Sequence, residues 1–124
     1  GYAPDYVEAM WLMLQQKKPS DYVISTGKTF TIRDFVNNSA KYLGMKITWK
    51  GNGLNEVGYD SITNKLIIKI NKQFYRPAEV NYLRGDSSKA KKVLKWKPNY
   101  NVDKILHDIY LWLKENKNLR KYFL

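Results

Sequence analysis

The sequence predicts an α/β fold with short parallel or mixed strands and about four helices. Segments in which apolar residues recur at helical spacing alternate with short β-prone runs, and this alternation favours helices packed on strands. The length of 124 residues corresponds to one domain or to part of one. Hydrophobic residues make up 44% of the chain and charged residues 27%, which is typical of a globular protein with a core.

The N-terminal segment combines one helix pattern with one strand pattern. A helix is expected at residues 4–16, where Pro4 suits the first turn. Its apolar residues recur at positions i, i+3, i+4 and i+7, and they are Val7, Met10, Trp11 and Leu14. Residues 22–26 form a continuous β-prone run after the helix, which is typical of a buried parallel strand.

The next pair of elements is marked by its end signals. Thr31 and Asp34 have the spacing of a capping box, and the helix that follows is expected to stop at Gly44. Apolar and polar residues alternate along residues 46–50. This alternation predicts a half-exposed strand.

The second half of the chain is expected to contain one more strand and two more helices. Residues 51–64 are polar and rich in glycine and asparagine, which predicts a loop, and residues 65–71 carry an apolar strand pattern. A short helix capped by Ser87 is expected to extend through Leu94. A final helix is expected at residues 102–116.

The charge of the chain indicates an anionic partner. Twenty-two Lys and Arg residues against eleven Asp and Glu residues give a formal net charge of +11. Nucleic acid, an acidic surface and a phosphorylated small molecule all fit this charge. A membrane partner is not expected, because the longest apolar stretch, residues 7–14, is far shorter than the ~20 residues that span a bilayer.

Catalytic and metal-binding patterns are sparse. The absence of cysteine excludes thiol catalysis and cysteine-based zinc sites, and His107 is the only histidine, so no metal or catalytic site is predicted. Two pairs have the spacing of a catalytic Tyr-x-x-x-Lys, namely Tyr42 with Lys46 and Tyr110 with Lys114. With ten tyrosines and this many lysines, such pairs are expected by chance.

Arg76 and Glu79 are the strongest candidate binding residues. They flank Pro77 in the segment Arg76-Pro77-Ala78-Glu79-Val80. An arginine fork can bind a diphosphate through parallel hydrogen bonds, and a carboxylate can accept hydrogen bonds from both hydroxyls of a ribose. The spacing fits a nucleoside diphosphate site, but spacing alone favours an ordinary surface ion pair between the two side chains.

Several longer segments carry a family resemblance, in the same order along residues 1–110. The motifs are Asp5-Tyr6-Val7-Glu8-Ala9-Met10-Trp11-Leu12-Met13-Leu14-Gln15, Asn55-Glu56-Val57-Gly58, Tyr75-Arg76-Pro77-Ala78-Glu79-Val80, Gly85-Asp86-Ser87-Ser88-Lys89-Ala90 and Trp96-Lys97-Pro98. Together they resemble the C-terminal part of the GDP-mannose 4,6-dehydratase family. This family belongs to the extended short-chain dehydrogenases/reductases.

The resemblance implies a fragment of a two-lobed enzyme. Residues 1–27 would supply a late helix and the last strand of a Rossmann lobe, and residues 28–124 would build the sugar-nucleotide lobe. The rest of the Rossmann core, with the bound NADP and all catalytic groups, would lie outside this chain. Arg76 would bind the diphosphate of the substrate, and Glu79 the ribose of its nucleoside.

The function implied by the resemblance is NADP-dependent conversion of GDP-mannose to GDP-4-keto-6-deoxymannose, a step toward GDP-fucose, in the cytoplasm. This chain alone is expected to be inactive. The apolar face that Val7, Met10, Trp11, Leu14 and Ile24 would form is expected to stay uncovered, so we expect a homo-oligomer or a missing partner lobe. The alternative is a noncatalytic basic module that binds nucleic acid or a partner protein.

Overall fold

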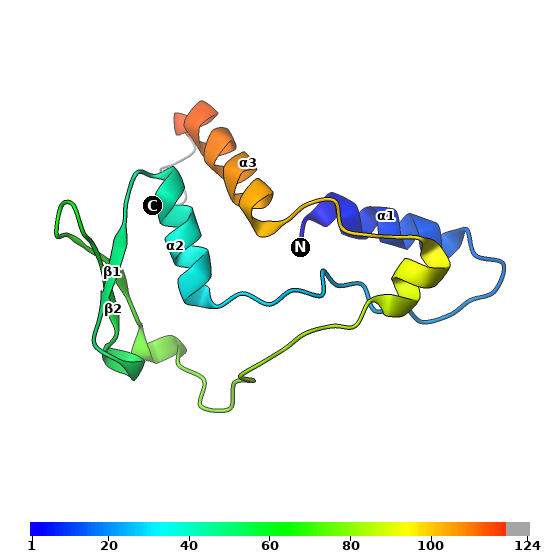
Figure 1. Ribbon diagram of the computed structural model, residues 1–124, viewed down its shortest axis with the longest axis horizontal. Helices are drawn as coiled ribbons and strands as arrows, with labels where there is room; N and C mark the ends of the chain where they lie inside the picture. The colour runs from blue at the N-terminus through cyan, green and yellow to red at the C-terminus, as the bar shows by residue number, and fades with distance from the viewer. Residues whose placement is uncertain (119–124) are drawn as a thin grey trace. The chain divides into compact units, whose positions relative to one another are not determined.

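The computed structural model describes residues 1–118, which fall into two compact units (Figure 1). Unit 1 contains Gly1–Thr29 and the chain from Tyr82 onward, and unit 2 contains Phe30–Asn81. The helices of unit 1 are α1 (Ala3–Leu14), the π-helical turn η3 (Ala90–Leu94) and α3 (Val102–Glu115). Unit 2 contains α2 (Ile32–Tyr42), β1 (Ile47–Lys50), the 3-10 turn η1 (Gly53–Asn55), β2 (Val57–Asp60), β3 (Leu66–Lys69) and the 3-10 turn η2 (Lys72–Phe74). This content confirms the α/β class.

The two units are defined by which residues of this chain pack against one another. The predicted domains, residues 1–27 and 28–124, refer to the lobes of a larger enzyme and stay a prediction. Residues 119–124 of the second predicted domain lie outside the described residues.

The interior of unit 1 forms around Trp96, which is only 2% exposed. Ala9 of α1 and Ala90 of η3 are both fully buried beside it, together with Leu94. Small side chains at these two positions allow the helix and the turn to pack closely. The indole Nε1 of Trp96 donates a hydrogen bond to the backbone carbonyl oxygen of Asp5 at 2.7 Å, so the buried donor is satisfied.

Asp5 makes a second connection between the start and the end of unit 1. Its buried carboxylate accepts a hydrogen bond from the backbone N–H of Tyr100 at 3.1 Å. The ring of Tyr100 stacks on Tyr2 with 3.9 Å between centroids, and Tyr6 meets Trp96 edge to face. These contacts explain why the only buried residues of α1 are Asp5 and Ala9.

The apolar stripe of α1 is exposed. Leu14 is 81% exposed, and exposed fractions of about 60% are found at Val7, Met10 and Trp11. Ile24 differs from the prediction, because it is half-buried and packs against the unit 1 core. The uncovered stripe on the helix is therefore confirmed, whereas Ile24 does not belong to it.

Residues 22–26 are not a strand, contrary to the prediction. They run extended, but none of the backbone ladders in residues 1–118 includes them. A strand needs a hydrogen-bonded neighbour, and this segment instead has a side-chain contact, in which Ser25 Oγ donates to the backbone oxygen of Gly85 at 2.7 Å. A β-prone composition alone could not reveal the missing neighbour.

Ser87 is not the helix cap that the sequence predicts. Its side chain is buried and its Oγ has no hydrogen-bond partner among the described residues. Asp86 takes the capping role, because its Oδ1 accepts hydrogen bonds from the backbone N–H of Ser88 at 2.9 Å and from the Ser88 hydroxyl at 2.6 Å. The predicted short helix is present as a helical turn that ends at Lys95, whose φ is +57°.

Unit 2 begins with the capped helix that the sequence predicts. The hydroxyl of Thr31 accepts from the backbone N–H of Asp34, and the Asp34 side chain accepts from the backbone N–H of Thr31. The helix ends at Tyr42, and Gly44, the predicted stop signal, follows two residues later with a left-handed φ of +71°. There the N–H groups of Gly44 and Met45 donate to Lys41 and Ala40, which satisfies the last carbonyls.

The sheet of unit 2 is an antiparallel meander in the order β1-β2-β3, not a parallel or mixed sheet. Strand β2 lies within the predicted loop at residues 51–64. The sequence signal is weak, because Gly58 and Asp60 are poor strand formers. Gly58 is required for packing, since a Cβ there would lie 3.0 Å from Ile47 and 3.2 Å from Ile68.

Helix α2 is joined to the sheet by polar contacts around Trp49. The indole Nε1 of Trp49 donates to Asn37 Oδ1 at 3.0 Å, and the guanidinium of Arg33 lies over the indole ring. Arg33 also forms an ion pair with Glu56, just before β2. The alternating burial of β1 agrees with the predicted half-exposed strand.

The turn after β2 is organised by Asp60, which is 3% exposed. Its carboxylate accepts hydrogen bonds from the Thr63 hydroxyl at 2.6 Å and from the backbone N–H groups of Lys46, Ile62 and Thr63. The bond from the Thr63 hydroxyl is the largest of the effects that lower the pKa of Asp60, although burial opposes it.

Helix α3 agrees with the predicted final helix. Asn101 caps it by accepting a hydrogen bond from the backbone N–H of Lys104 at 2.9 Å. Leu106 on its predicted apolar stripe is buried, whereas Ile109 is 49% exposed. His107 is exposed, as its position off the stripe predicts.

Candidate functional site

The predicted binding residues, Arg76 and Glu79, lie in an exposed loop of unit 2 directly after η2. Pro77 fixes the backbone of this loop and disfavours a helical conformation at Arg76. The side chain of Asn71 accepts a hydrogen bond from the backbone N–H of Gln73 at 3.0 Å, which supports the turn that leads into the loop. The loop therefore presents both charged side chains to solvent.

The two side chains do not pair with each other. None of the ion pairs found within residues 1–118 includes Arg76 or Glu79. The surface ion pair that the spacing of Arg76 and Glu79 allows is thus not formed. Both groups keep their hydrogen-bonding capacity for a ligand.

A pocket of about 670 Å³ lies in the same unit, immediately before the loop in sequence. One wall consists of residues 54–57, and the other consists of residues 69–72, from the end of β3 into η2. Asn55, Glu56 and Val57 belong to one of the motifs that carry the resemblance, and Lys72 is four residues before Arg76. The volume is in the range of pockets that bind small molecules.

The electrostatics of this pocket are mixed. Lys69 and Lys72 contribute positive charge to one wall, whereas the carboxylate of Glu56 on the other wall is occupied by Arg33. The charged groups of the pocket that can bind a ligand are therefore the two lysines. Sequence reasoning missed this pocket, because its second wall depends on the pairing of β2 with β3, and β2 was expected to be loop.

His107 and the pair Tyr42 with Lys46 are not supported as catalytic groups by their surroundings. The Nδ1 of His107 lies 3.9 Å from Asp108 Oδ1 on the exposed side of α3. Helix α2 ends at Tyr42, so Tyr42 and Lys46 are not one turn apart on a helix. No group of three or more acidic or histidine side chains in the described part of the chain could hold a metal ion.

None of the helices formed by residues 1–118 is long and apolar enough to cross a membrane.

Comparison with known proteins connects these features to one family. The family model for GDP-mannose 4,6 dehydratase matches residues 1–109. A GDP-mannose 4,6 dehydratase from Drosophila melanogaster is 47% identical over 109 residues, which cover 88% of this chain and 28% of that protein. The protein of the same name from Homo sapiens is 45% identical over the same share of this chain. The one from Dictyostelium discoideum is 52% identical over 96 residues, which cover 77% of this chain and 27% of that protein.

These matches define the family of the chain. The chain belongs to the GDP-mannose 4,6-dehydratase family, as its motifs predict. It spans between 27% and 29% of the length of the relatives in Drosophila, Homo sapiens and Dictyostelium. The alternative of a basic module for nucleic acid or a partner protein receives no support from these comparisons.

Proposed function

We propose that this chain is the substrate-binding, C-terminal part of a GDP-mannose 4,6-dehydratase, in which Arg76 and Glu79 hold the GDP moiety. The observation that carries the proposal is that both side chains are exposed and form no ion pair on one loop, next in sequence to a pocket of suitable size. The family membership of the chain supplies the ligand class.

The proposed role of each residue follows from its chemistry. The Arg76 guanidinium donates two parallel hydrogen bonds to diphosphate oxygens, which a lysine cannot reproduce. The Glu79 carboxylate accepts from the two hydroxyls of the ribose. The two contacts bind a part of the substrate that is remote from the reacting sugar carbons, and such binding energy positions the sugar for the reaction.

The chemistry of the whole enzyme would depend on groups outside this chain. NADP supplies hydride transfer in the proposed reaction, GDP-mannose to GDP-4-keto-6-deoxymannose. This chain has no G-x-G-x-x-G sequence, so we assign it no contact with the cofactor. We propose that the complete protein is a cytoplasmic extended short-chain dehydrogenase/reductase and that the segment alone has no dehydratase activity.

The exposed stripe of α1 supports the assembly part of the proposal. Val7, Met10, Trp11 and Leu14 form a contiguous apolar surface on one helix face, and such surfaces mark interaction sites. We propose that the missing lobe or a second copy of the chain covers this stripe. Light scattering of the 124-residue chain at high concentration should show self-association, and a monodisperse monomer would contradict it.

Calorimetric titration of the complete dehydratase with GDP tests the proposal. Arg76→Ala should weaken GDP binding by about one to two orders of magnitude, because a charge-assisted hydrogen bond contributes roughly 1.5–3 kcal/mol. Arg76→Lys should recover only part of the loss. Glu79→Gln should weaken GDP binding more than diphosphate binding, because its partner is the ribose.

Lys65→Ala is the matched control, since this exposed lysine belongs to the same unit but contributes to neither pocket nor loop. It should leave the GDP affinity within twofold. Unchanged GDP affinity in a folded Arg76→Ala variant would contradict the proposal. Tight, strongly salt-dependent binding of DNA by the chain would favour the nucleic-acid alternative instead.

A further inference from the structure

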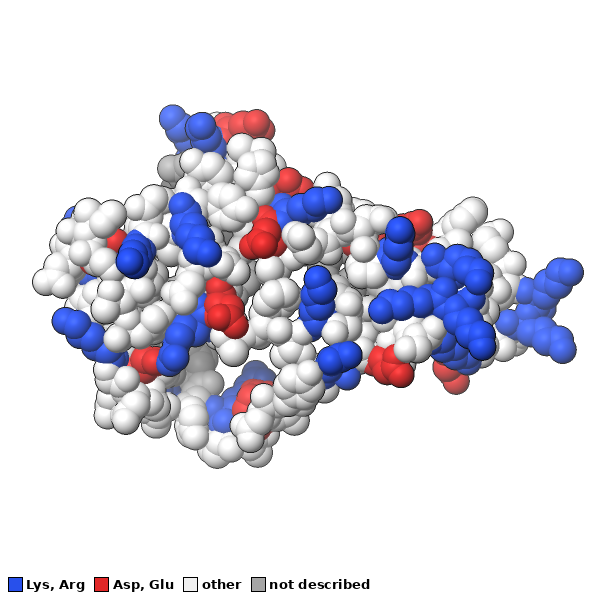
Figure 2. Space-filling view, viewed as in Figure 1, with Lys and Arg blue, Asp and Glu red and all other residues white. Residues whose placement is uncertain are grey.

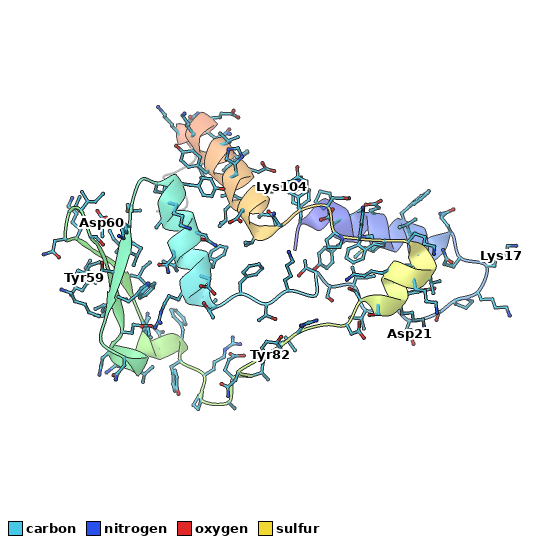
Figure 3. All side chains as sticks on the ribbon, viewed as in Figure 1. Lys17, Asp21, Tyr59, Asp60, Tyr82 and Lys104 are labelled. Atoms are coloured by element: carbon cyan, nitrogen blue, oxygen red, sulfur yellow. The ribbon has the colours of Figure 1, made fainter. Side chains whose placement is uncertain are left out.

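Unit 1 contains a second pocket, of about 580 Å³, that the sequence motifs do not reveal. Its walls are residues 26–28, Tyr82 and residues 84–88, with Lys91 of η3 at one side. All of these residues belong to unit 1, whereas Arg76 and Glu79 belong to unit 2. Figure 3 labels Tyr82 on the segment that leads toward η3.

The two walls are held together by direct contacts. Ser25 Oγ donates to the Gly85 backbone oxygen at 2.7 Å, and Thr29 Oγ1 donates to the Leu83 backbone oxygen at 3.4 Å. A Cβ at Gly85 would lie 2.8 Å from Ser25 Cβ, so only glycine allows this approach. The pocket is thus formed by two segments that lie about 60 residues apart in the chain.

Three cationic side chains line the pocket, and none of them forms a close ion pair within residues 1–118. They are Lys28, Arg84 and Lys91. The Lys91 Nζ lies 4.0 Å from the place where a Cβ of Gly27 would be, so the ammonium group reaches across to the opposite wall. Figure 2 shows Lys and Arg side chains gathered over the part of unit 1 that contains η3.

Asp86 is the one carboxylate in the pocket wall, and it is hydrogen-bonded to Ser88. Asp86 Oδ1 accepts two hydrogen bonds from Ser88. These bonds lower the pKa of Asp86, and the positive charges of Lys91 and Arg84 act in the same direction. Asp86 therefore stays ionised, and it offsets only part of the positive charge of the pocket.

Hydroxyl groups complete the wall. Ser87 is 2% exposed and its Oγ has no hydrogen-bond partner among the described residues. A buried polar group without a partner is costly, and a ligand oxygen beside it removes this cost. Tyr82 and Thr26 also belong to the lining, but their hydroxyl groups are hydrogen-bonded within the chain, that of Tyr82 with Arg84 and Thr29 and that of Thr26 with the backbone of Lys28.

We infer that this pocket binds a phosphate group, held by Lys28, Arg84 and Lys91 and by the hydroxyl of Ser87. Charged donors around a pocket with neutral hydroxyls match the three oxygens of a terminal phosphate. The inference does not rest on the proposed function, because none of its residues belongs to the Arg76 loop.

Titration of the 124-residue chain with inorganic pyrophosphate tests the inference, followed by backbone amide NMR shifts and calorimetry. The largest shifts should occur at Gly27, Gly85 and Ser87. Lys91→Gln and Lys28→Gln should each weaken pyrophosphate binding about tenfold, which corresponds to ~1.4 kcal/mol. Lys92→Gln is the matched control, because this exposed neighbour on η3 does not line the pocket, and it should change the affinity less than twofold.

Two further titrations distinguish a nucleotide from free pyrophosphate as the source of the phosphate, and this pocket from the Arg76 loop as the binding site. GDP should bind this pocket no more tightly than pyrophosphate does. The lining has cationic groups for the phosphates, but besides Asp86 it has no carboxylate that could bind a ribose. Arg76→Ala should leave the shifts at Gly27 and Gly85 unchanged, whatever its effect on GDP binding. Absence of binding, equal losses in Lys91→Gln and Lys92→Gln, or shifts confined to the Arg76 loop would each overturn the inference.

Discussion

Units 1 and 2 are stabilised in different ways. The interior of unit 1 joins residues from opposite ends of the sequence, as in the hydrogen bond from Trp96 to Asp5, which are 91 positions apart. Unit 2 joins consecutive elements, because β1, β2 and β3 pair in chain order. Contacts that are local in sequence form at a smaller entropic cost than contacts between distant segments.

This difference also separates the two candidate anion sites. The Arg76 loop follows a local meander and can be recognised from a short sequence motif. The pocket of Lys28, Arg84 and Lys91 exists only because distant segments meet at Ser25 and Gly85. A motif search along the chain cannot detect the second kind of site.

Trp96→Ala should have the largest effect, and it should act on unit 1. Removal of a buried tryptophan costs about 3–5 kcal/mol, and here it also removes the hydrogen bond to Asp5. Trp11→Ala is the matched control, because that side chain is 59% exposed. Chemical denaturation of both variants checks this, and similar losses of stability would contradict the assigned core.

The sequence predicted the local elements of both units well. The capping box at Thr31 and the stop at Gly44 are correct because each signal involves residues at most a few positions apart. Residues 22–26 and β2 were assigned incorrectly, because strand formation depends on a neighbour that composition does not specify. The spacing of Arg76 and Glu79 identified candidates, but their exposure and the nearby pocket required the structure.

Gly58→Ala should destabilise unit 2 by an intermediate amount. The added methyl group would lie 3.0 Å from Ile47 and 3.3 Å from Trp49, which is tighter than ordinary packing. Overpacking of this kind costs about 1–3 kcal/mol. Thermal unfolding followed by far-UV circular dichroism measures the change. A stabilised variant would show that the packing around Gly58 accommodates an added methyl group, and it would contradict the prediction.

Thr31→Ala should have a smaller effect, confined to the start of α2. The variant loses the side chain that accepts a hydrogen bond from the backbone N–H of Asp34, which costs about 1 kcal/mol. Thr31→Ser keeps the acceptor and should retain most of the stability. Equal losses in the two variants, measured by urea unfolding, would mean that the methyl group of Thr31 and not the cap stabilises the helix.

The smallest effect should appear only in acid. The pKa of Asp60 is lower in the folded protein than its ordinary value, mainly because of the Thr63 hydroxyl, so its ionised form stabilises unit 2 above the unfolded pKa of about 3.9. That contribution is lost as the pH falls through the folded pKa. Urea unfolding at pH 6 and pH 3 should show a smaller pH dependence for Asp60→Asn than for the unaltered chain, and identical slopes would contradict this.

The two units have separate interiors, with Trp96 at the centre of the interior of unit 1. Native-state hydrogen exchange of the unaltered chain and of Trp96→Ala tests it most directly. We expect faster exchange in Trp96→Ala at the α1 amides and at Lys91–Leu94, with unchanged protection at Thr48–Lys50 and Val57–Tyr59. Equal loss of protection at α1 and at the sheet would show that the two units share one interior.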